Sequence, residues 1–352
     1  MMTDPPRRAA PAALACLASL ASLAAGPPGI VSSGFVADEP PTPSCHASTL
    51  VEAREGRLLA AWFGGTDEGA DDVAIYLAAR VSGRWSTPSK VFDGLQPDGR
   101  RFPCWNPVLA RPKGGPVLLF AKVGPSPSGW WGVLATSGDE GRTWSPPRRL
   151  PGEVIGPVKN KPLELPDGSL LCPSSREDPK LGWRVFMERT ADLGTTWGVV
   201  GPLNDGVALG AIQPSLLTHP GGRLQALGRS KQGRIAEAWS DDLGKSWSPM
   251  ALTSWPNPNS GTDALTLRDG RQLLVSNPVE RGRTPLTVAL SADGKAWREA
   301  LILEDGPGEY SYPAAIQAAD GLIHVSYTWR RERIKHVAID PKKLTDPPAV
   351  GR

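Results

Sequence analysis

The chain has 352 residues, a length that suits one large all-β domain better than a small single core. Its 39 glycines and 37 prolines punctuate turns and interrupt helices, so many short strands and few long helices are expected. The 39 basic and 36 acidic side chains give a net charge of +3 without a long basic run. This balance argues against a protein that binds nucleic acid through a phosphate-tracking patch.

The first 25 residues differ from the rest of the chain. Arg7 and Arg8 precede an apolar run over residues 9–25, and small residues follow it. This order is typical of a secretory signal peptide, because the run is short for a membrane anchor and ends in cleavable residues. We therefore predict a signal peptide over residues 1–25, a short linker over 26–37, and a secreted or periplasmic protein without a membrane span once the signal is removed. A retained N-terminal anchor is the alternative.

The mature part contains three cysteines that show no CxxC spacing: Cys45, Cys104 and Cys172. An odd number leaves at least one thiol unpaired within the chain and allows at most one disulfide. No dedicated metal-ligand cluster, phosphate loop or nucleotide fingerprint stands out. We therefore expect neither a metal nor a cofactor.

One local pattern recurs along the chain: Ser or Thr, any residue, Asp, any residue, Gly, any residue, Ser or Thr, Trp. It occupies residues 137–144, 190–197 and 240–247, and a shortened copy occupies 291–297. In each copy the aspartate can accept hydrogen bonds from its own turn, the glycine can take a positive φ, and the tryptophan can pack the hairpin. We interpret this Asp-box as turn structure, not as catalytic machinery.

A turn followed by an apolar strand recurs six times between these boxes, at Gly56, Gly115, Gly168, Gly222, Gly270 and Gly321. Both series repeat about every fifty residues. Short strands joined by tight turns in a repeated unit describe a β-propeller with four strands per blade. Six hairpins therefore predict an all-β, six-bladed propeller over residues 38–352, with residues 334–339 available to close the ring. A β-sandwich is the alternative, and it does not need so regular a period.

These boxes at this spacing resemble the sialidase (neuraminidase) superfamily, especially its bacterial predicted-neuraminidase branch with BNR (Asp-box) repeats. The resemblance covers nearly the whole mature chain and implies an exo-acting glycoside hydrolase whose partner is a glycan or glycoconjugate. Sialidases use a tyrosine nucleophile, since the carboxylate on the anomeric carbon of sialic acid repels an anionic one. Tyr312 stands at the family's distance before the turn at Asp320 and Gly321, so the resemblance implies that Tyr312 is the nucleophile. Tyr310 lies two residues out of register.

The family also clamps the substrate carboxylate with three arginines, because a guanidinium forms a bidentate pair with a carboxylate. Arg283 and Arg229 match two of these positions, and Arg176 holds a similar place in the third blade. His46 stands where the first arginine is expected. An imidazole can hydrogen-bond a sugar or a carboxylate, but it is not always charged.

The family's acid/base residue belongs to the loop after the first inner strand, which here carries four carboxylates: Asp67, Glu68, Asp71 and Asp72. Crowded carboxylates suit acid/base work because like charges raise one another's pKa. We favour Glu68 or Asp72 for this role, with Asp71 next, and a solvated acidic loop is the alternative. Lys159 stands where the family has the glutamate that activates the tyrosine, and Glu177 is the candidate to replace it.

Polar residues precede a proline at the start of several inner strands: Asn106, Lys161, Gln213 and Tyr312. Equivalent positions in the blades of a propeller point toward the same axial region. Asn106 and Gln213 therefore join the predicted substrate-binding residues.

Two other functions remain open. One is a lectin-like propeller that binds glycans without cleaving them, and the other is a carbohydrate-active enzyme of altered chemistry, such as a lyase acting on uronic acids. A hydrolase needs Tyr312 to face a carboxylate of the acidic loop, whereas a lectin does not. The fold alone does not decide, because function depends on the site.

Overall fold

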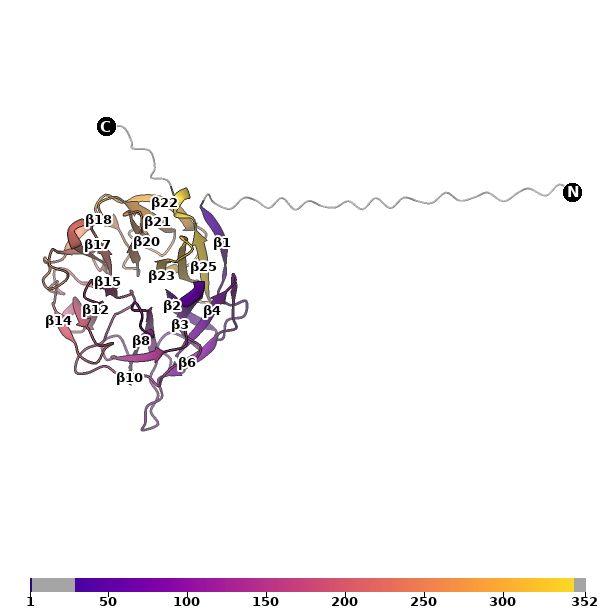
Figure 1. Cartoon of the computed structure of the whole chain (residues 1–352), viewed down its shortest axis with the longest axis horizontal. Helices are drawn as coiled ribbons and strands as arrows, with labels where there is room; N and C mark the ends of the chain where they lie inside the picture. Colours follow the sequence, from indigo (N-terminus) through magenta and orange to yellow (C-terminus); the bar gives the residue numbers. More distant parts are fainter. Residues whose placement is uncertain (2–28, 345–352) are drawn as a thin grey trace, which may run out of the picture.

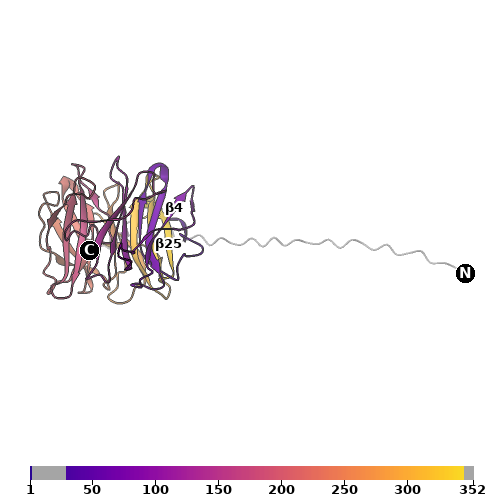
Figure 2. The same ribbon diagram turned by 90° about the horizontal axis from the view of Figure 1, so that it is seen from below.

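Six antiparallel sheets surround a central axis in the computed structural model, which describes Met1 and residues 29–344 (Figure 1). Seen from the side, the strands of the blades run roughly along the axis of the ring (Figure 2). The predicted all-β, six-bladed propeller is therefore confirmed. The predicted signal peptide, apart from Met1, lies outside the described residues.

The strands of the first three blades follow one another along the chain. The first blade has β2 (Ser44–Glu52), β3 (Leu58–Gly65), β4 (Ala74–Val81), β5 (Arg84–Trp85) and β6 (Ser89–Asp93). The second has β7 (Cys104–Ala110), β8 (Val117–Val123), β9 (Trp131–Ser137) and β10 (Arg148–Arg149). The third has β11 (Leu163–Glu164), β12 (Leu170–Asp178), β13 (Gly182–Thr190) and β14 (Gly198–Val200).

The remaining blades complete the ring. The fourth has β15 (Ala211–Thr218), β16 (Leu224–Ser230), β17 (Arg234–Ser240) and β18 (Ala251–Pro256). The fifth has β19 (Asp263–Thr266), β20 (Gln272–Ser276), β21 (Leu286–Ser291) and β22 (Arg298–Glu304), and the sixth has β23 (Tyr310–Gln317), β24 (Ile323–Trp329), β25 (Arg333–Ile339) and β1 (Ile30–Phe35). The only helical elements in the described residues are three 3₁₀ turns: η1 (Arg54–Gly56), η2 (Pro220–Gly222) and η3 (Pro341–Lys343).

The second strand of each blade forms its hydrophobic centre. Every residue of β3, β8 and β16 is buried. Both faces of these strands are covered because each blade packs against a neighbour on either side, and burial of apolar area is the main stabilising term. The stacked blades therefore fix the positions of the inner strands that surround the axis.

The Asp-boxes are hairpin turns, as predicted. Asp139 accepts hydrogen bonds from the backbone N–H of Thr143 (2.8 Å) and the hydroxyl of Ser137 (2.8 Å). Gly141 has a φ of 81°, a conformation that favours glycine. The hydroxyl of Thr143 also donates to Asp139 at 2.6 Å, and this bond first, then the other two, holds the pKa of Asp139 well below its usual range. The carboxylate is therefore part of the turn.

The ring is closed by the N-terminal strand. β1 pairs antiparallel with β25, with Gly34 opposite His336 and Ile30 opposite Ile339 (Figure 1). Residues 334–339 thus form the third strand of the sixth blade, and β1 adds the outermost one. This corrects the predicted boundary: residues 30–35 belong to the propeller and are not linker, because their backbone groups complete the sheet.

Candidate active site

The innermost strand of four blades contains a β-bulge at an equivalent place. One residue in each adopts a left-handed conformation, and the strand pairing shifts register there, at Ala47, Asn106, Gln213 and Tyr312. Bulges re-aim side chains, and left-handed non-glycine residues are typical of constrained functional positions. In the third blade the left-handed residue is Lys159, with a φ of 74°. We call the residues gathered around Tyr312 the axial site.

Tyr312 is the centre of the axial site. Three cationic groups approach its ring: Arg229 at 5.4 Å, Arg283 at 5.8 Å and Lys159 at 6.0 Å from the centroid. The ring is only 7% exposed, and its hydroxyl forms no hydrogen bond with any described residue. The structure therefore brings the predicted nucleophile together with two of the three predicted arginines.

His46 packs directly against this tyrosine. The two ring centroids are 4.2 Å apart. Its Nδ1 is hydrogen-bonded to Thr328 Oγ1 at 2.9 Å, and its Nε2 is buried without a partner among the described residues. Burial, and after it the charges of Arg331 and Arg283, lowers the pKa of His46 well below its usual value. His46 is therefore a neutral imidazole with one unused nitrogen and does not supply the charge of an arginine.

Lys159 reaches across the axis and ties three blades together. Its ammonium donates to Asn160 Oδ1 at 2.8 Å, to the Thr262 carbonyl at 2.7 Å and to the Pro313 carbonyl. These three acceptors use all the protons of an ammonium. Burial lowers the pKa of Lys159 to about 7, against the opposing charge of Asp263. Because Pro313 follows Tyr312, Lys159 positions the tyrosine and adds positive charge beside it.

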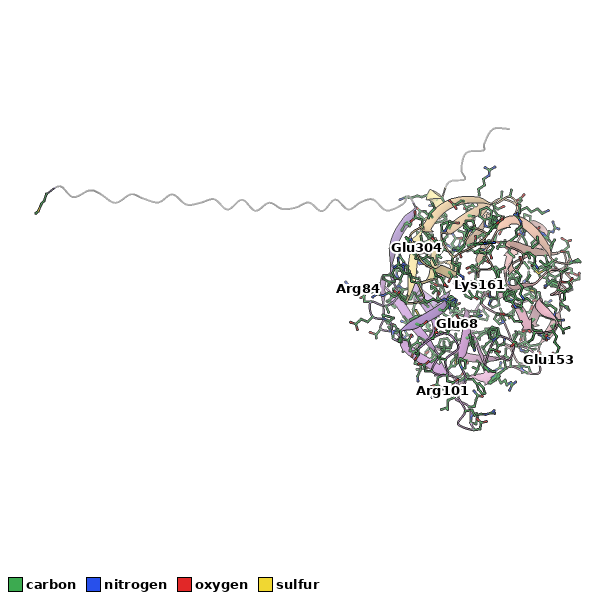
Figure 3. All side chains as sticks on the ribbon, turned by 180° about the vertical axis from the view of Figure 1, so that it is seen from behind. Glu68, Arg84, Arg101, Glu153, Lys161 and Glu304 are labelled. Atoms are coloured by element: carbon green, nitrogen blue, oxygen red, sulfur yellow. The ribbon has the colours of Figure 1, made fainter. Side chains whose placement is uncertain are left out.

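An ion-pair network lies at the more exposed side of the site. Glu309 accepts from Arg283 at 2.6 Å and from Arg331 at 2.8 Å. Burial raises the pKa of Glu309, but Arg283 and Arg331 outweigh it and hold this pKa below its usual value. Arg331 also pairs with Glu68, whose side chain is 37% exposed. Glu68 is therefore the carboxylate of the acidic loop that reaches the axial site, and Figure 3 shows it toward the middle of the ring.

Glu177 faces the same group of charges from the end of β12. Burial raises its pKa, while Arg229 and Lys231 oppose that effect and Glu68 adds to it. These mutual influences place Glu177 near Arg229 and Glu68. Glu177 was predicted from the sequence to replace the glutamate that activates the tyrosine in the family. Its raised pKa suits a carboxyl group that takes up a proton.

Three predicted site residues do not join the axial site. Asp72 turns back on its own loop and accepts from the Thr66 backbone N–H at 3.0 Å and from its hydroxyl. Asp71 is exposed and forms no hydrogen bond or ion pair with a described residue. Neither therefore joins Tyr312, and Glu68 is the loop carboxylate we retain.

Arg176 is the third of these residues, and it points away from the axis. Its guanidinium stacks on Phe186 at 4.5 Å and pairs with Glu153 at 3.3 Å, and Glu153 lies at the periphery in Figure 3. Successive side chains of a strand point to opposite faces. Since the neighbouring Glu177 faces the axial site, Arg176 cannot. The predicted arginine clamp is therefore reduced to Arg229 and Arg283.

The predicted binding residues Asn106 and Gln213 occupy two of the bulges. Both are buried, and Gln213 Oε1 has no partner among the described residues. The Gln213 carbonyl accepts from Asn160 Nδ2 at 2.9 Å. Lys161, expected at the same level, instead pairs with Asp263 at 2.8 Å. The register predicted for the third blade was therefore two residues too late, because Lys159 is the equivalent residue.

The sequence did not point to Arg331 or Glu309, nor to Gly261, where a Cβ would meet the ring of Tyr312 at 3.0 Å. Arg331 and Arg330 are adjacent left-handed turn residues, and the guanidinium of Arg330 packs on Trp329 at 4.5 Å, away from Glu309. The amino-acid sequence alone does not indicate which of these two arginines faces the axial site. Glu309 lies three residues before Tyr312, and this closeness in the sequence was the one feature that could have identified it as a site residue.

The described residues contain no group of three or more histidine, cysteine, aspartate or glutamate side chains that could hold a metal ion. Within residues 29–344, no helix has the length and apolar character that crossing a membrane requires.

Residues 56–325 match the family model of the BNR repeat-like domain. A sialidase of Bacteroides fragilis (strain YCH46) is 24% identical over an alignment of 233 residues that covers 61% of this chain and 42% of that protein. The chain thus spans less than half the length of this relative.

Several solved structures share the fold. A protein of unknown function from Dyadobacter fermentans has a TM-score of 0.73 at 16% identity, covering 88% of this chain and 98% of that one. The Hadza microbial sialidase Hz136 has a TM-score of 0.73 at 18% identity, covering 86% and 67%. The NanB sialidase of Streptococcus pneumoniae, as its K499G mutant, has a TM-score of 0.69 at 14% identity, covering 86% and 69%. At these identities the likeness shows the fold.

Proposed function

Since the chain belongs to the family of BNR repeat-like domains, within the sialidase superfamily, we propose that it is an exo-acting glycoside hydrolase that removes a terminal acidic sugar with retention of configuration. The observation that carries this proposal is the unpartnered hydroxyl of Tyr312 beside Arg229, Arg283 and Lys159. The substrate is a glycan or glycoconjugate. We also propose secretion or periplasmic export, because the order of basic, apolar and small residues over 1–25 is typical of an export signal.

The acidic group of the substrate binds to Arg229. This arginine has no ion pair with a described carboxylate: its Nη1 donates to the Asn259 carbonyl at 3.0 Å, and its Nε is buried without a partner. A buried donor that lacks an acceptor is costly, and an anionic ligand removes that cost. Arg283, which already shares Glu309, contributes a second donor.

Tyr312 attacks the anomeric carbon. The three neighbouring cations stabilise the phenolate as it forms, because an opposite charge favours the ionised state. His46 takes the phenolic proton on Nε2, in the tautomer whose Nδ1–H donates to Thr328. A neutral imidazole can do this, whereas an arginine at that position could not.

Glu68 acts as the general acid and then as the general base. Glu68 first takes a proton from solvent and then gives it to the oxygen of the leaving group. The resulting carboxylate takes a proton from the water that attacks the tyrosyl–sugar bond, and the released phenolate of Tyr312 recovers its proton from His46. Arg331, the partner of Glu68, keeps the carboxylate over the axial site. Glu177, whose pKa is raised by burial, is the reserve acid if Glu68 proves dispensable.

The test begins with a panel of aryl glycosides that carry different terminal sugars. On the glycoside that is cleaved, Tyr312→Phe should lower kcat by about a thousandfold or more, since it removes the attacking oxygen and keeps the ring. Tyr310→Phe is the matched control, because the Tyr310 hydroxyl only donates to the Pro307 carbonyl at 3.3 Å. Near-normal turnover by Tyr312→Phe would exclude the tyrosine mechanism.

One observation favours a second candidate, β-elimination on a uronic acid. A lyase needs a group that neutralises the carboxylate and an acid/base pair, and Arg229 with the adjacent His46 and Tyr312 matches that set. The two reactions are separated by their products. An unsaturated uronate with new ultraviolet absorbance indicates elimination, a saturated free sugar indicates hydrolysis, and binding without either indicates a lectin.

A further inference from the structure

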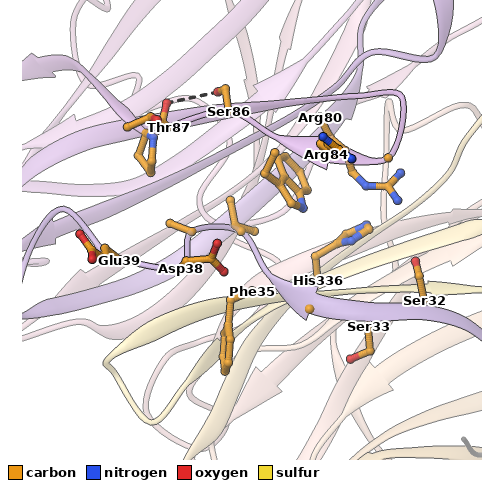
Figure 4. A pocket seen from close by; sticks show the side chains of 16 residues that line it. Ser32, Ser33, Phe35, Asp38, Glu39, Arg80, Arg84, Ser86, Thr87 and His336 are labelled. Carbon is orange, nitrogen blue, oxygen red and sulfur yellow. Dashed lines mark hydrogen bonds between the residues drawn. The ribbon is translucent and has the colours of Figure 1, made fainter. Parts of the chain in front are cut away.

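A cavity of about 650 Å³ lies on the rim, at the seam where β1 closes the ring against the first blade (Figure 4). Its walls come from β1, β25, β4 and the β5 turn, and it shares no residue with the axial site. We call it the rim cavity. Three features of its walls together point to a ligand.

A missing side chain opens the rim cavity. Gly34 of β1 pairs directly with His336 of β25, so a side chain at residue 34 would stand beside the imidazole on the same face. A Cβ at Gly34 would meet nothing within 4 Å, and its φ is not in the region reserved for glycine. The backbone there does not require glycine. The absence of a side chain at residue 34 allows His336, which is only 3% exposed, to line the cavity.

A buried relay sets the hydrogen-bonding character of His336. Asp320 Oδ2 lies 3.3 Å from His324 Nε2, and His324 Nδ1 lies 3.0 Å from His336 Nε2. A carboxylate only accepts, so His324 donates from Nε2 and accepts at Nδ1, and His336 donates from Nε2. Burial lowers the pKa of both imidazoles, that of His336 to about 3, so both are neutral. Nδ1 of His336 is then an acceptor that no described residue uses.

Two arginines and an indole complete this end of the cavity. Arg80 and Arg84 line it, and neither forms an ion pair with a described carboxylate. Figure 4 shows them beside His336, with Asp38 and Glu39 at the opposite end. The half-buried ring of Trp85 packs edge-on against His336, with centroids 5.3 Å apart. Cations bind an anionic substituent, carboxylates and an imidazole nitrogen accept from hydroxyls, and an indole offers an aromatic surface to a sugar ring.

We propose that the rim cavity is an accessory glycan-binding site for a sugar residue that carries a carboxylate or a sulfate ester. The anionic group sits between Arg80 and Arg84, and the ring hydroxyls donate to His336 Nδ1 and to Asp38 and Glu39. The site holds an acidic glycan on the rim, independently of any turnover at the axis.

Isothermal titration of the full chain with three trisaccharides tests this proposal: trigalacturonate, a sulfated galactose trisaccharide and the uncharged galactose trisaccharide. Arg84→Ala should weaken the acidic probes about tenfold or more, because it removes a charge-assisted contact. Gly34→Leu should abolish the same binding by filling the cavity while leaving the arginines in place. Arg84 is exposed and Gly34 has open space, so both variants should keep the unfolding temperature of the parent protein.

The matched control is Arg149→Ala. Like Arg84, Arg149 is an exposed arginine near a tryptophan, with its guanidinium 4.8 Å from the centroid of Trp131, but it does not line the rim cavity. Its substitution therefore removes the same charge elsewhere on the surface. It should leave binding unchanged. The difference between the two acidic probes tells whether carboxylate or sulfate is preferred. The proposal is overturned if no acidic probe binds, or if Arg84→Ala and Gly34→Leu bind as the parent does, in which case the axial site alone takes the glycan. Turnover of the aryl glycoside, read separately, decides the function of the axial site.

Discussion

Gly261→Ala should disable the axial site while leaving the propeller folded. Gly261 occupies the fifth-blade position that corresponds to Tyr312, and a Cβ there would meet three ring atoms of Tyr312 at 3.0, 3.1 and 3.2 Å. Ordinary carbon contacts lie at about 3.5–4.0 Å, so the ring must move by about half an ångström. His46 packs against the same ring. A displacement of this kind should lower kcat/KM roughly ten- to a hundredfold, and the strain should cost about 1–3 kcal/mol of stability.

The measurement is kcat/KM on the cleaved glycoside, with urea unfolding in parallel. Gly198→Ala is the control, since a Cβ at Gly198 meets nothing within 4 Å and the residue has no positive φ. It should retain full activity and gain about 0.4–1 kcal/mol of stability from reduced chain entropy. If Gly261→Ala turns over as fast as Gly198→Ala while Tyr312→Phe is inactive, the placement of the ring is not what catalysis depends on.

Two further predictions concern buried ionisable groups. Burial lowers the pKa of Lys122 and Lys159 to about 7, below the unfolded value of about 10.4, so the unfolded chain binds more protons between these values and stability rises with pH there. The rise should reach about 1.4 kcal/mol per pH unit for each lysine in urea titrations at neutral and alkaline pH, and an unchanged slope in Lys159→Met would contradict this reasoning. Burial likewise raises the pKa of the Cys45 thiol to about 12 and raises those of Cys104 and Cys172, all three unpaired. The folded protein should therefore resist alkylation at these cysteines and the unfolded protein should not, with peptide mass spectrometry as the readout; rapid native labelling would show that the blades open.

The fold could be predicted because its signal is local. Each Asp-box contains its own hydrogen-bond acceptor, its own positive-φ glycine and its own tryptophan within one turn, as Asp192, Gly194 and Trp197 show. The strand that closes the ring has no such signal. β1 finds its partner β25 about three hundred residues later, and no nearby residue reports a pairing over that distance.

The axial site could be predicted only where a residue lies at a fixed place in its blade. Tyr312, Arg229, Arg283 and His46 follow from counting back to a hairpin turn, and the structure brings them together. The direction of the side chains in the acidic loop could not be predicted in this way, because the local turns of a loop determine it and not the strand register. Asp72 is used to build that loop, and only the neighbouring Glu68 extends to Arg331.

His46 and Lys159 both differ from the residues that the family has at these positions, but the charge around Tyr312 changes less than the two differences suggest. Where the family has an arginine, His46 is neutral; where it has a glutamate, Lys159 is a buried cation on the same tyrosine. Two guanidinium groups, those of Arg229 and Arg283, thus approach the ring together with the amine of Lys159, whose pKa burial lowers to about 7. In the mechanism that we propose, the proton acceptor is the imidazole of His46, whose Nε2 has no partner among the described residues, and not a carboxylate. The proposed mechanism depends on a neutral His46, and burial first, then the charges of Arg331 and Arg283, lowers the pKa of this histidine well below its usual value.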